Sequence, residues 1–337
     1  MGSMNPSNPY VEIDRLVCGA GFVASETASR AGALQAAVRR KLSDRSICAS
    51  IVSSLLPYRQ AEGRIALLTG FVVPETFPRG ETDGPLGTIV LARALHRVGF
   101  SPTIYADTQV LDHMTWLAAE IGADVTVRSI PDATPFGFVA ETDAVVAIEK
   151  PGENVHGYLH DWGGRRIDTG STSVDSWFVE MNRAGKLTIA IGDRGNEIGF
   201  GAVRDELLAL VPQARRCSCG CGGGVAAVTP ATLLYPAAVS NWGAYGLCAA
   251  LALSAGDPSL PIRPEEEARL LNVAAVRGCR DGLRMTAAFG VDGIDGSVSI
   301  QFVERLRHLV AVTLDAGETT KSPVRGSIEG RNKALHE

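Results

Sequence analysis

Four short polar motifs in this chain carry carboxylates and amides, the side chains that transfer protons and bind hard cations. Each motif comes after an apolar run, and the runs are residues 65–68, 144–148, 187–191 and 233–239. The motifs are Glu81-Thr82-Asp83-Gly84-Pro85, Glu149-Lys150-Pro151-Gly152, Asp193-Arg194-Gly195-Asn196-Glu197 and Ser240-Asn241-Trp242-Gly243. If the runs are parallel strands, all four motifs lie at the edge of the sheet where open α/β sheets bind ligands. The sequence therefore predicts that they gather around one small molecule.

The densest motif, residues 193–197, combines two acids and an amide with a glycine that lets backbone N–H groups approach a ligand. A helix beginning after it would also favour an anion. Such a set can bind a metal, orient a carboxylate or move protons, and a capped, glycine-rich turn has the same composition. It is not a dinucleotide fingerprint, because Gly199-Phe200-Gly201 lacks the third glycine.

The other motifs each have a structural alternative. Asp83 precedes Pro85, a good first-turn helix residue, so Asp83 could serve only as a helix cap. Glu81 has no capping task there and is the better functional candidate. Glu149 comes at the end of an apolar strand, and its side chain lies either in a cleft or on the exposed surface. Ser240-Asn241-Trp242 is either part of the site or a helix start with a core aromatic.

From residue 64 onward, strands and helices alternate, which is typical of βαβ units around a parallel sheet. Further strands are expected at 103–105 and 125–127, and helices at 86–98, 110–121, 175–183, 198–210, 242–254, 264–276 and 299–312. The predicted fold is α/β, with a mostly parallel sheet flanked by helices in a Rossmann-like three-layer arrangement. One domain should span 5–315, followed by a disordered tail at 316–337. Within it, 5–60 form a helical N-terminal arm whose second helix, from residue 47, should end at Pro57.

Composition excludes several function classes. A net charge of −5 without a basic block argues against a nucleic-acid partner or an anionic membrane surface. No apolar run is long enough to span a bilayer, and the N-terminus lacks the pattern of a secretion signal. Seven cysteines, an odd number, favour free thiols in a reducing compartment. We therefore expect a cytoplasmic protein with a small-molecule partner; a homo-oligomer is left open.

Three of the cysteines form the pattern Cys217-x-Cys219-x-Cys221 in a glycine-rich segment. Structural zinc usually takes four ligands, often as two Cys-x-x-Cys pairs. This spacing is tighter, and no histidine or second pair lies close in sequence, so a mobile loop with incidental thiols is the alternative. His156 and His160 fall in the long loop expected at 150–172, a kind of segment that is often functional.

In order along the chain, the motifs resemble those of the D-glutamate cyclase family. The matching patterns are Glu-Thr-Asp-Gly-Pro-x-Gly, Ile-Glu-x-Pro-Gly-x-Asn, Ile-Gly-Asp-x-Gly-Asn-Glu-Ile-Gly-x-Gly and Val-Ser-Asn-Trp-Gly-Ala-Tyr. The resemblance covers roughly residues 12 to 312 and is closest to the family's C-terminal cyclase domain. It implies an α/β fold and a hydro-lyase reaction that forms a lactam within one molecule, converting D-glutamate to 5-oxo-D-proline and water. Arg194, His156 and Thr232 depart from the family pattern, which admits a related amino diacid as substrate.

Roles follow for the matched residues as expectations. Glu197 is expected to transfer the proton, with Asp193 and Glu149 as further catalytic acids or as ligands of a divalent metal, Mg²⁺ or Mn²⁺. No organic cofactor is expected. The expected substrate-binding residues are Glu81, Asp83, Asn154, Arg194, Gly195, Asn196, Ser240, Asn241 and Trp242. Two alternatives stay open: an amino-acid isomerase or lyase on the same scaffold, and a non-enzymatic protein that binds a small molecule or a metal.

Overall fold

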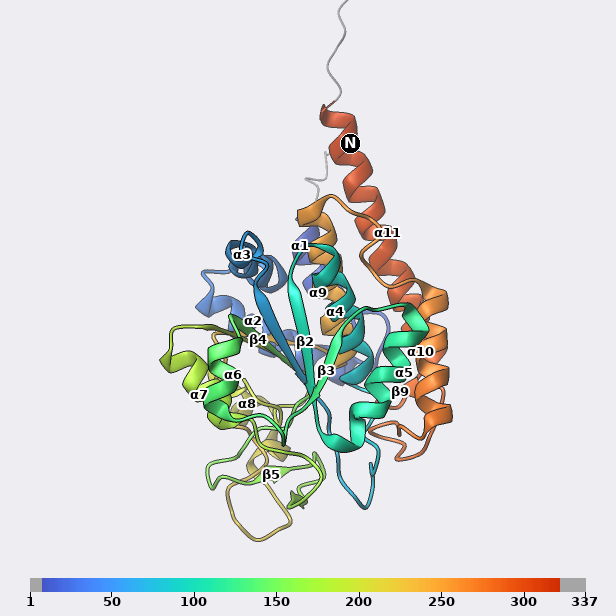
Figure 1. The fold of residues 1–337 in the computed structure, drawn as a ribbon. Coiled ribbons are helices and arrows are strands. Elements are labelled where there is room, and N and C mark those ends of the chain that lie inside the picture. Colours follow the sequence, from blue (N-terminus) through green and yellow to red (C-terminus); the bar gives the residue numbers. More distant parts are fainter. Residues whose placement is uncertain (1–7, 322–337) are drawn as a thin grey trace, which may run out of the picture.

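The computed structural model describes residues 8–321, with side chains up to residue 316, and a six-stranded sheet forms its centre (Figure 1). All neighbouring strands are parallel, in the order β3-β2-β1-β4-β7-β8. The strands are β1 (Arg64–Thr69), β2 (Ser101–Ala106), β3 (Thr126–Ser129), β4 (Ala144–Ile148), β7 (Leu187–Gly192) and β8 (Leu233–Pro236). The predicted α/β fold with a parallel sheet is thereby confirmed.

Helices cover both faces of this sheet, and every residue of β4 and β7 is consequently buried. Figure 1 shows α4, α5 and α9 on one side and α6 and α7 on the other. α10 and α11 pack outside this layer, α10 against α5 and α11 against α9. The helices after β1 are α4 (Pro85–Arg97), α5 (Leu111–Ile121), α6 (Pro135–Glu141), α7 (Asp175–Arg183), α8 (Arg204–Leu210), α9 (Ser240–Ala255), α10 (Pro264–Arg277) and α11 (Gly296–Lys321).

The strand order reverses between β1 and β4. These strands lie side by side although β2 and β3 come between them in the chain, so the chain leaves β1 toward one edge of the sheet and β4 toward the other. A crevice opens at such a switch point, beyond the carboxyl ends of the strands. The loops that follow β1, β4 and β7 meet there, at the lower end of the view in Figure 1.

The N-terminal arm consists of three helices, α1 (Pro9–Val17), α2 (Ser25–Lys41) and α3 (Ile47–Arg59). Their apolar faces join the main hydrophobic core, with α2 and α3 against β8 and with α1 and α3 against α9. The prediction that Pro57 ends α3 is wrong, because the helix continues to Arg59. Pro57 lies in the last turn, and the carbonyl left without its N–H partner belongs to the exposed Ser53.

Several elements are absent from the sequence-based prediction. α6 is one, and the long segment at 150–172 contains a short antiparallel pair, β5 (Leu159–His160) with β6 (Arg166–Ile167). A second pair, β9 (Gly290–Val291) with β10 (Ile294–Asp295), precedes α11. Where a helix was predicted over 198–210, a turn and a 3₁₀ helix (Gly201–Val203) come before α8.

The last described helix, α11, runs past the predicted start of the tail at residue 316 and ends at Lys321. The rest of that predicted tail, 322–337, lies outside the described residues. Among the helices of residues 8–321, none combines the length and the apolar character needed to cross a lipid bilayer.

Candidate active site

A pocket of about 170 Å³ lies at the carboxyl edge of the sheet. Its volume is below the range usual for drug-sized ligands and is suited to a small metabolite. Both apolar and polar side chains line it, and several of the polar ones are buried. The lining residues are Phe71, Phe77, Glu81, Glu149, Asp161, Trp162, Gly163, Arg165, Arg194, Asn196, Gly282, Leu283 and Met285. A larger hollow of about 570 Å³ lies beside β3 and α6. Its charged lining residues are all exposed, and they are Arg128, Asp132 and Glu141.

Besides Asp161, which is paired with Arg165, a cluster of six carboxyl groups is buried in and behind this pocket. They are Glu81, Asp83, Glu149, Asp193, Glu197 and Asp292. Carboxyl oxygens of Glu149, Asp193 and Glu197 lie within 4.8 Å of one another, and so do those of Asp83, Asp193 and Asp292. Asp193 is common to both groups and stands at the centre of the cluster. Its two side-chain oxygens are buried and accept no hydrogen bond.

Burial and mutual repulsion favour the protonated form of these acids. Burial, with Glu197 and Asp193 nearby, raises the pKa of Glu149 well above its usual range. Burial, with Asp292 and Asp83 nearby, does the same for the pKa of Glu81. The pKa values of Asp83, Asp193 and Asp292 are each raised to about 7, again mainly by burial. The cluster therefore holds protons at neutral pH.

Arg194 supplies positive charge to the cluster. Its Nη2 donates to Asp292 Oδ2 at 2.9 Å, and its Nε lies 3.2 Å from Asp193 Oδ2. Burial opposes the charged guanidinium, but Asp193 and Asp292 outweigh it and raise the pKa of Arg194. The guanidinium is thus a fixed cation that also lines the pocket. Substrate binding, the role expected for Arg194, has to compete with these two acids.

Glu149 is held in an unusual backbone conformation, with φ at 48°, directly after β4. Such strain in a non-glycine residue is often retained at functional sites. Its Oε2 accepts a hydrogen bond from Ser240 Oγ at 2.5 Å. Gly84 makes room for it, since a Cβ there would lie 2.8 Å from the Cβ of Glu149. The end of β4, the start of α4 and the start of α9 thus fix the position of this carboxyl.

Glu197 stands behind the pocket and shapes its own loop. Its Oε2 accepts the Gly195 N–H at 2.7 Å, and its Oε1 accepts the Arg194 N–H at 3.2 Å. The backbone N–H of Gly195, one of the expected substrate-binding residues, is therefore already used by Glu197. The proton-transfer role of Glu197 stays a prediction, but Glu149 rather than Glu197 lines the pocket.

Asp83 and Asn241 are used by the two helices that meet behind the site. Asp83 accepts hydrogen bonds from the N–H groups of Ser240 and Asn241 at the start of α9. Asn241 Oδ1 accepts those of Gly84 and Gly87 at the start of α4. Asp83 does cap a helix, but α9 rather than the α4 that follows it in sequence. Neither residue lines the pocket.

Of the remaining expected substrate-binding residues, Asn196 lines the pocket, whereas Asn154 and Trp242 do not. Asn196 lines the pocket with a buried Oδ1 that has no hydrogen-bond donor, while its Nδ2 donates to the His160 carbonyl at 3.2 Å. Asn154 turns away, donating to the Gly224 carbonyl at 2.8 Å. Trp242 is in the core: its indole N–H donates to Ser299 Oγ and its ring stacks on Phe302. The substrate-binding role expected for Asn154 and Trp242 stays a prediction.

Two features of the site escaped the sequence analysis. Asp292 belongs to the turn between β9 and β10. An Asp-Gly pair is an ordinary hairpin signal, and Asp292 does not follow a strand of the parallel sheet, so its position in the sequence gives no reason to place it in the site. Lys150, beside Glu149, is fully buried and forms an ion pair with the equally buried Asp107 after β2. Its Nζ also donates to the Gly70 carbonyl after β1, at 3.3 Å. The lysine thus ties together the ends of three strands around the crevice.

The chain is similar to known proteins over most of its length. The family model described as D-glutamate cyclase-like, C-terminal, matches residues 26–307. A curated relative, the "D-glutamate cyclase, mitochondrial" of Homo sapiens, is 26% identical over 208 residues. That alignment covers 56% of this chain but only 32% of the human protein. The four motifs with their buried acids all lie inside the range that the family model matches.

Proposed function

The chain belongs to the D-glutamate cyclase-like family, and on that basis we propose that it is a hydro-lyase that closes an amino diacid into a lactam. The proposed reaction converts D-glutamate, or a closely related amino diacid, to 5-oxo-D-proline or the matching lactam, with release of water. The printed name of the human relative supports this choice. The observation that carries the proposal is the group of proton-holding carboxyls beside the fixed cation Arg194 in a small pocket.

The proton balance of this reaction shows what the site must supply. The substrate ammonium loses two protons as its nitrogen becomes the lactam N–H, and one carboxylate oxygen leaves as water after gaining both. No net proton is consumed, so the site has to accept protons near the nitrogen and donate them near the departing oxygen. A pair of neighbouring carboxyls with different pKa values is suited to this exchange.

We assign the two ends of this exchange to Asp193 and Glu149. Asp193, whose pKa is about 7 and whose oxygens accept no hydrogen bond, lies behind the lining residues Glu149 and Arg194 and accepts the proton that the ammonium releases. Glu149, whose pKa is raised well above its usual range by burial and by Glu197 and Asp193, lines the pocket and donates to the departing oxygen. Their carboxyl oxygens lie within 4.8 Å of each other, so a proton accepted by Asp193 can return to Glu149.

Arg194 and Asn196 are suited to hold the substrate in a folded conformation. The Arg194 guanidinium supplies the positive charge that a substrate carboxylate requires inside an acidic pocket. The free Oδ1 of Asn196 can accept a hydrogen bond from the ammonium. Glu81, at the same wall, adds a second acceptor for that group. Holding amine and carboxyl together promotes ring closure because little further entropy is lost on the way to the transition state.

A divalent cation, Mg²⁺ or Mn²⁺, fits the same carboxyls. Glu149, Asp193 and Glu197 would hold it, since hard cations prefer carboxylate oxygens and the two oxygens of Asp193 accept no hydrogen bond, although Oδ2 faces Arg194 Nε at 3.2 Å. When bound, it would neutralise the substrate carboxylate and make its carbon more electrophilic. Removal with a chelator, followed by addition of Mg²⁺ or Mn²⁺, measures whether turnover depends on the ion. Calorimetric titration of the same protein measures binding without reference to activity.

The test of the function is incubation of the purified protein with D- and L-amino diacids of different chain length. Mass spectrometry should show loss of one water from a D-amino diacid, with D-glutamate as the leading candidate. The matched pair Glu149→Gln and Glu141→Gln separates the pocket acid from an exposed glutamate on α6. The proposal is wrong if the folded protein releases water from none of the panel. Deuterium uptake at the α-carbon without water loss would instead identify an isomerase.

A further inference from the structure

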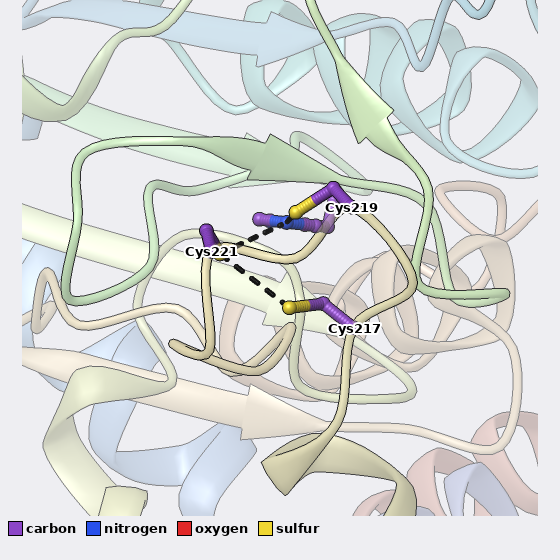
Figure 2. A group of neighbouring side chains, drawn as sticks. Cys217, Cys219 and Cys221 are labelled. Atoms are coloured by element: carbon purple, nitrogen blue, oxygen red, sulfur yellow. Dashed lines mark hydrogen bonds between the residues drawn. The ribbon is translucent and has the colours of Figure 1, made fainter.

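We propose that His160, Cys217, Cys219 and Cys221 form a structural zinc site outside the acidic cluster. The imidazole nitrogen and the three sulfurs all lie within 4.8 Å of one another. Figure 2 shows the three cysteines converging from one loop. Three thiolates and one imidazole are an established ligand set of structural zinc. The histidine that the sequence spacing lacked comes from β5, 57 residues before Cys217.

The distances are close to those of a tetrahedral zinc site. With usual zinc–sulfur and zinc–nitrogen bonds, neighbouring sulfurs should be about 3.8 Å apart and a sulfur and a nitrogen about 3.6 Å apart. Cys217 Sγ and Cys221 Sγ are 3.4 Å apart. His160 Nε2 lies 3.2 Å from Cys219 Sγ and 3.8 Å from Cys221 Sγ. Small outward movements of the sulfurs would make room for the ion.

The surroundings of the four side chains favour metal binding. His160 Nδ1 is 3.1 Å from the Tyr158 carbonyl, a contact in which Nδ1 must donate. A neutral imidazole that donates from Nδ1 presents the lone pair of Nε2 to the sulfurs, as in most metal-bound histidines. The Gly223 N–H and Asn154 Nδ2 donate to Cys221 Sγ, at 3.4 and 3.5 Å. Such donors stabilise a thiolate that binds a metal.

The loop that carries the cysteines lies at the surface and is held by polar contacts such as the hydrogen bond from the Ser218 N–H to the Gly164 carbonyl. None of residues 217–223 is buried, so none of them belongs to the hydrophobic core. Gly220 and Gly222 have φ of 81° and 74°, and a Cβ on either would meet nothing within 4 Å. They are therefore required by the backbone conformation rather than by space. A metal cross-link explains why a polar, glycine-rich loop should adopt this fixed shape.

The site also joins two parts of the pocket wall. His160 directly precedes Asp161, Trp162 and Gly163, which line the pocket, and its carbonyl accepts from Asn196. Ser218 N donates to the Gly164 carbonyl at 2.8 Å, so the cysteine loop packs on the same turn. Loss of zinc should therefore loosen one wall of the pocket. The effect of this loosening on turnover rests on the proposed function, whereas the metal content of the protein does not.

The first experiment is metal analysis of tag-free protein purified without chelator. We expect close to one zinc per chain in the wild type, little in Cys219→Ser and His160→Ala, and an unchanged amount in two controls. The controls are Cys18→Ser, a cysteine outside the group, and His156→Ala, an exposed histidine of the same loop. Retention of zinc by both ligand variants would overturn the proposal, and so would wild-type protein without zinc whose cysteines have formed a disulfide.

A second measurement uses only the wild type and so does not depend on variants that fold poorly. Cobalt added to metal-free protein should give the d–d absorption of a tetrahedral ion together with thiolate charge-transfer bands, and zinc should displace it. The absence of these bands in folded protein would contradict the proposal. If the zinc site is real but the proposed function is wrong, metal content and cobalt spectra stay as expected while the amino diacids remain unconverted.

Discussion

Asp83 and Asn241 lie 158 residues apart in the chain, and each caps the helix next to the other. Asp83 caps α9, which begins at the motif of Asn241, and Asn241 caps α4, which begins at the motif of Asp83. The carboxylate before α4 accepts the first N–H groups of α9, and the amide at the start of α9 accepts those of α4. Asn241 Nδ2 closes the arrangement by donating to the Thr82 carbonyl at 2.9 Å. Two helices that follow different strands are thereby locked together behind the pocket.

Asn241→Ala should destabilise the protein by about 2–4 kcal/mol, because it removes a helix cap and leaves buried N–H and carbonyl groups unpaired. Chemical denaturation followed by circular dichroism measures this loss. The control is Asn272→Ala on α10, an exposed position where the free energy of unfolding should hardly change. Equal stability of the two variants would show that the reciprocal capping contributes little.

Glu149→Gln should lower kcat by about 100- to 10,000-fold, the usual contribution of a general acid. The amide keeps the size of the side chain and can still pair with Ser240 Oγ, so the free energy of unfolding should change little.

Glu197→Gln should also lower turnover, and in addition it should weaken the loop, because one acceptor facing the N–H groups of Arg194 and Gly195 is replaced by a donor. Unchanged activity in Glu197→Gln would refute the proton-transfer role predicted for Glu197.

The pH dependence of kcat should report the two acids of the proposed exchange. Activity should rise as Asp193 loses its proton near pH 7, the pKa to which burial raises it, and fall at higher pH as Glu149 ionises. Arg194 lowers the pKa of Asp193, so Arg194→Gln should move the rising limb to higher pH. A rising limb at the same pH in folded Arg194→Gln would exclude Asp193 as the proton acceptor.

Stability should fall as pH rises toward and through neutrality. Burial raises the pKa of Asp292 to about 7, above the value of about 3.9 expected in the unfolded chain. The folded state therefore binds more protons between these values, and its stabilisation is lost as pH rises through about 7. Asp292→Asn removes one such group. Relative to this variant, the wild type should lose free energy of unfolding between pH 5 and pH 8, and parallel curves would contradict the shifted pKa.

Lys150→Met should destabilise the protein by about 3–5 kcal/mol, because it leaves the buried carboxylate of Asp107 without its cation. The double variant Lys150→Met, Asp107→Asn should recover much of this loss, since an uncharged amide can still accept the Thr172 N–H that Asp107 binds at 2.8 Å. Urea denaturation of the two variants tests the difference. Equal stability of the single and double variants would show that the unpaired charge of Asp107 is not the cause of the loss.

Much of the site could be predicted because parallel strands end at a common edge. Glu81, Glu149, Asp193 and Asn196 follow apolar runs, and the repeated strand–helix alternation is sufficient to place them near one another. Which of them reach the pocket could not be predicted, since capping residues and ligand-binding residues have the same composition. Asp83 and Asn241 illustrate this ambiguity, because their motif positions suit either task.

The sequence by itself determined the parallel α/β sheet, the order of its motifs and the family resemblance, because hydrophobic periodicity and short motifs are local properties of the chain. Only the tertiary structure decided that Asp292 joins the acidic cluster and that His160 meets Cys217, Cys219 and Cys221. These groupings depend on turns and hairpins that bring distant segments together, and no spacing along the chain encodes them. The raised pKa values likewise arise from burial, which exists only once the core has formed.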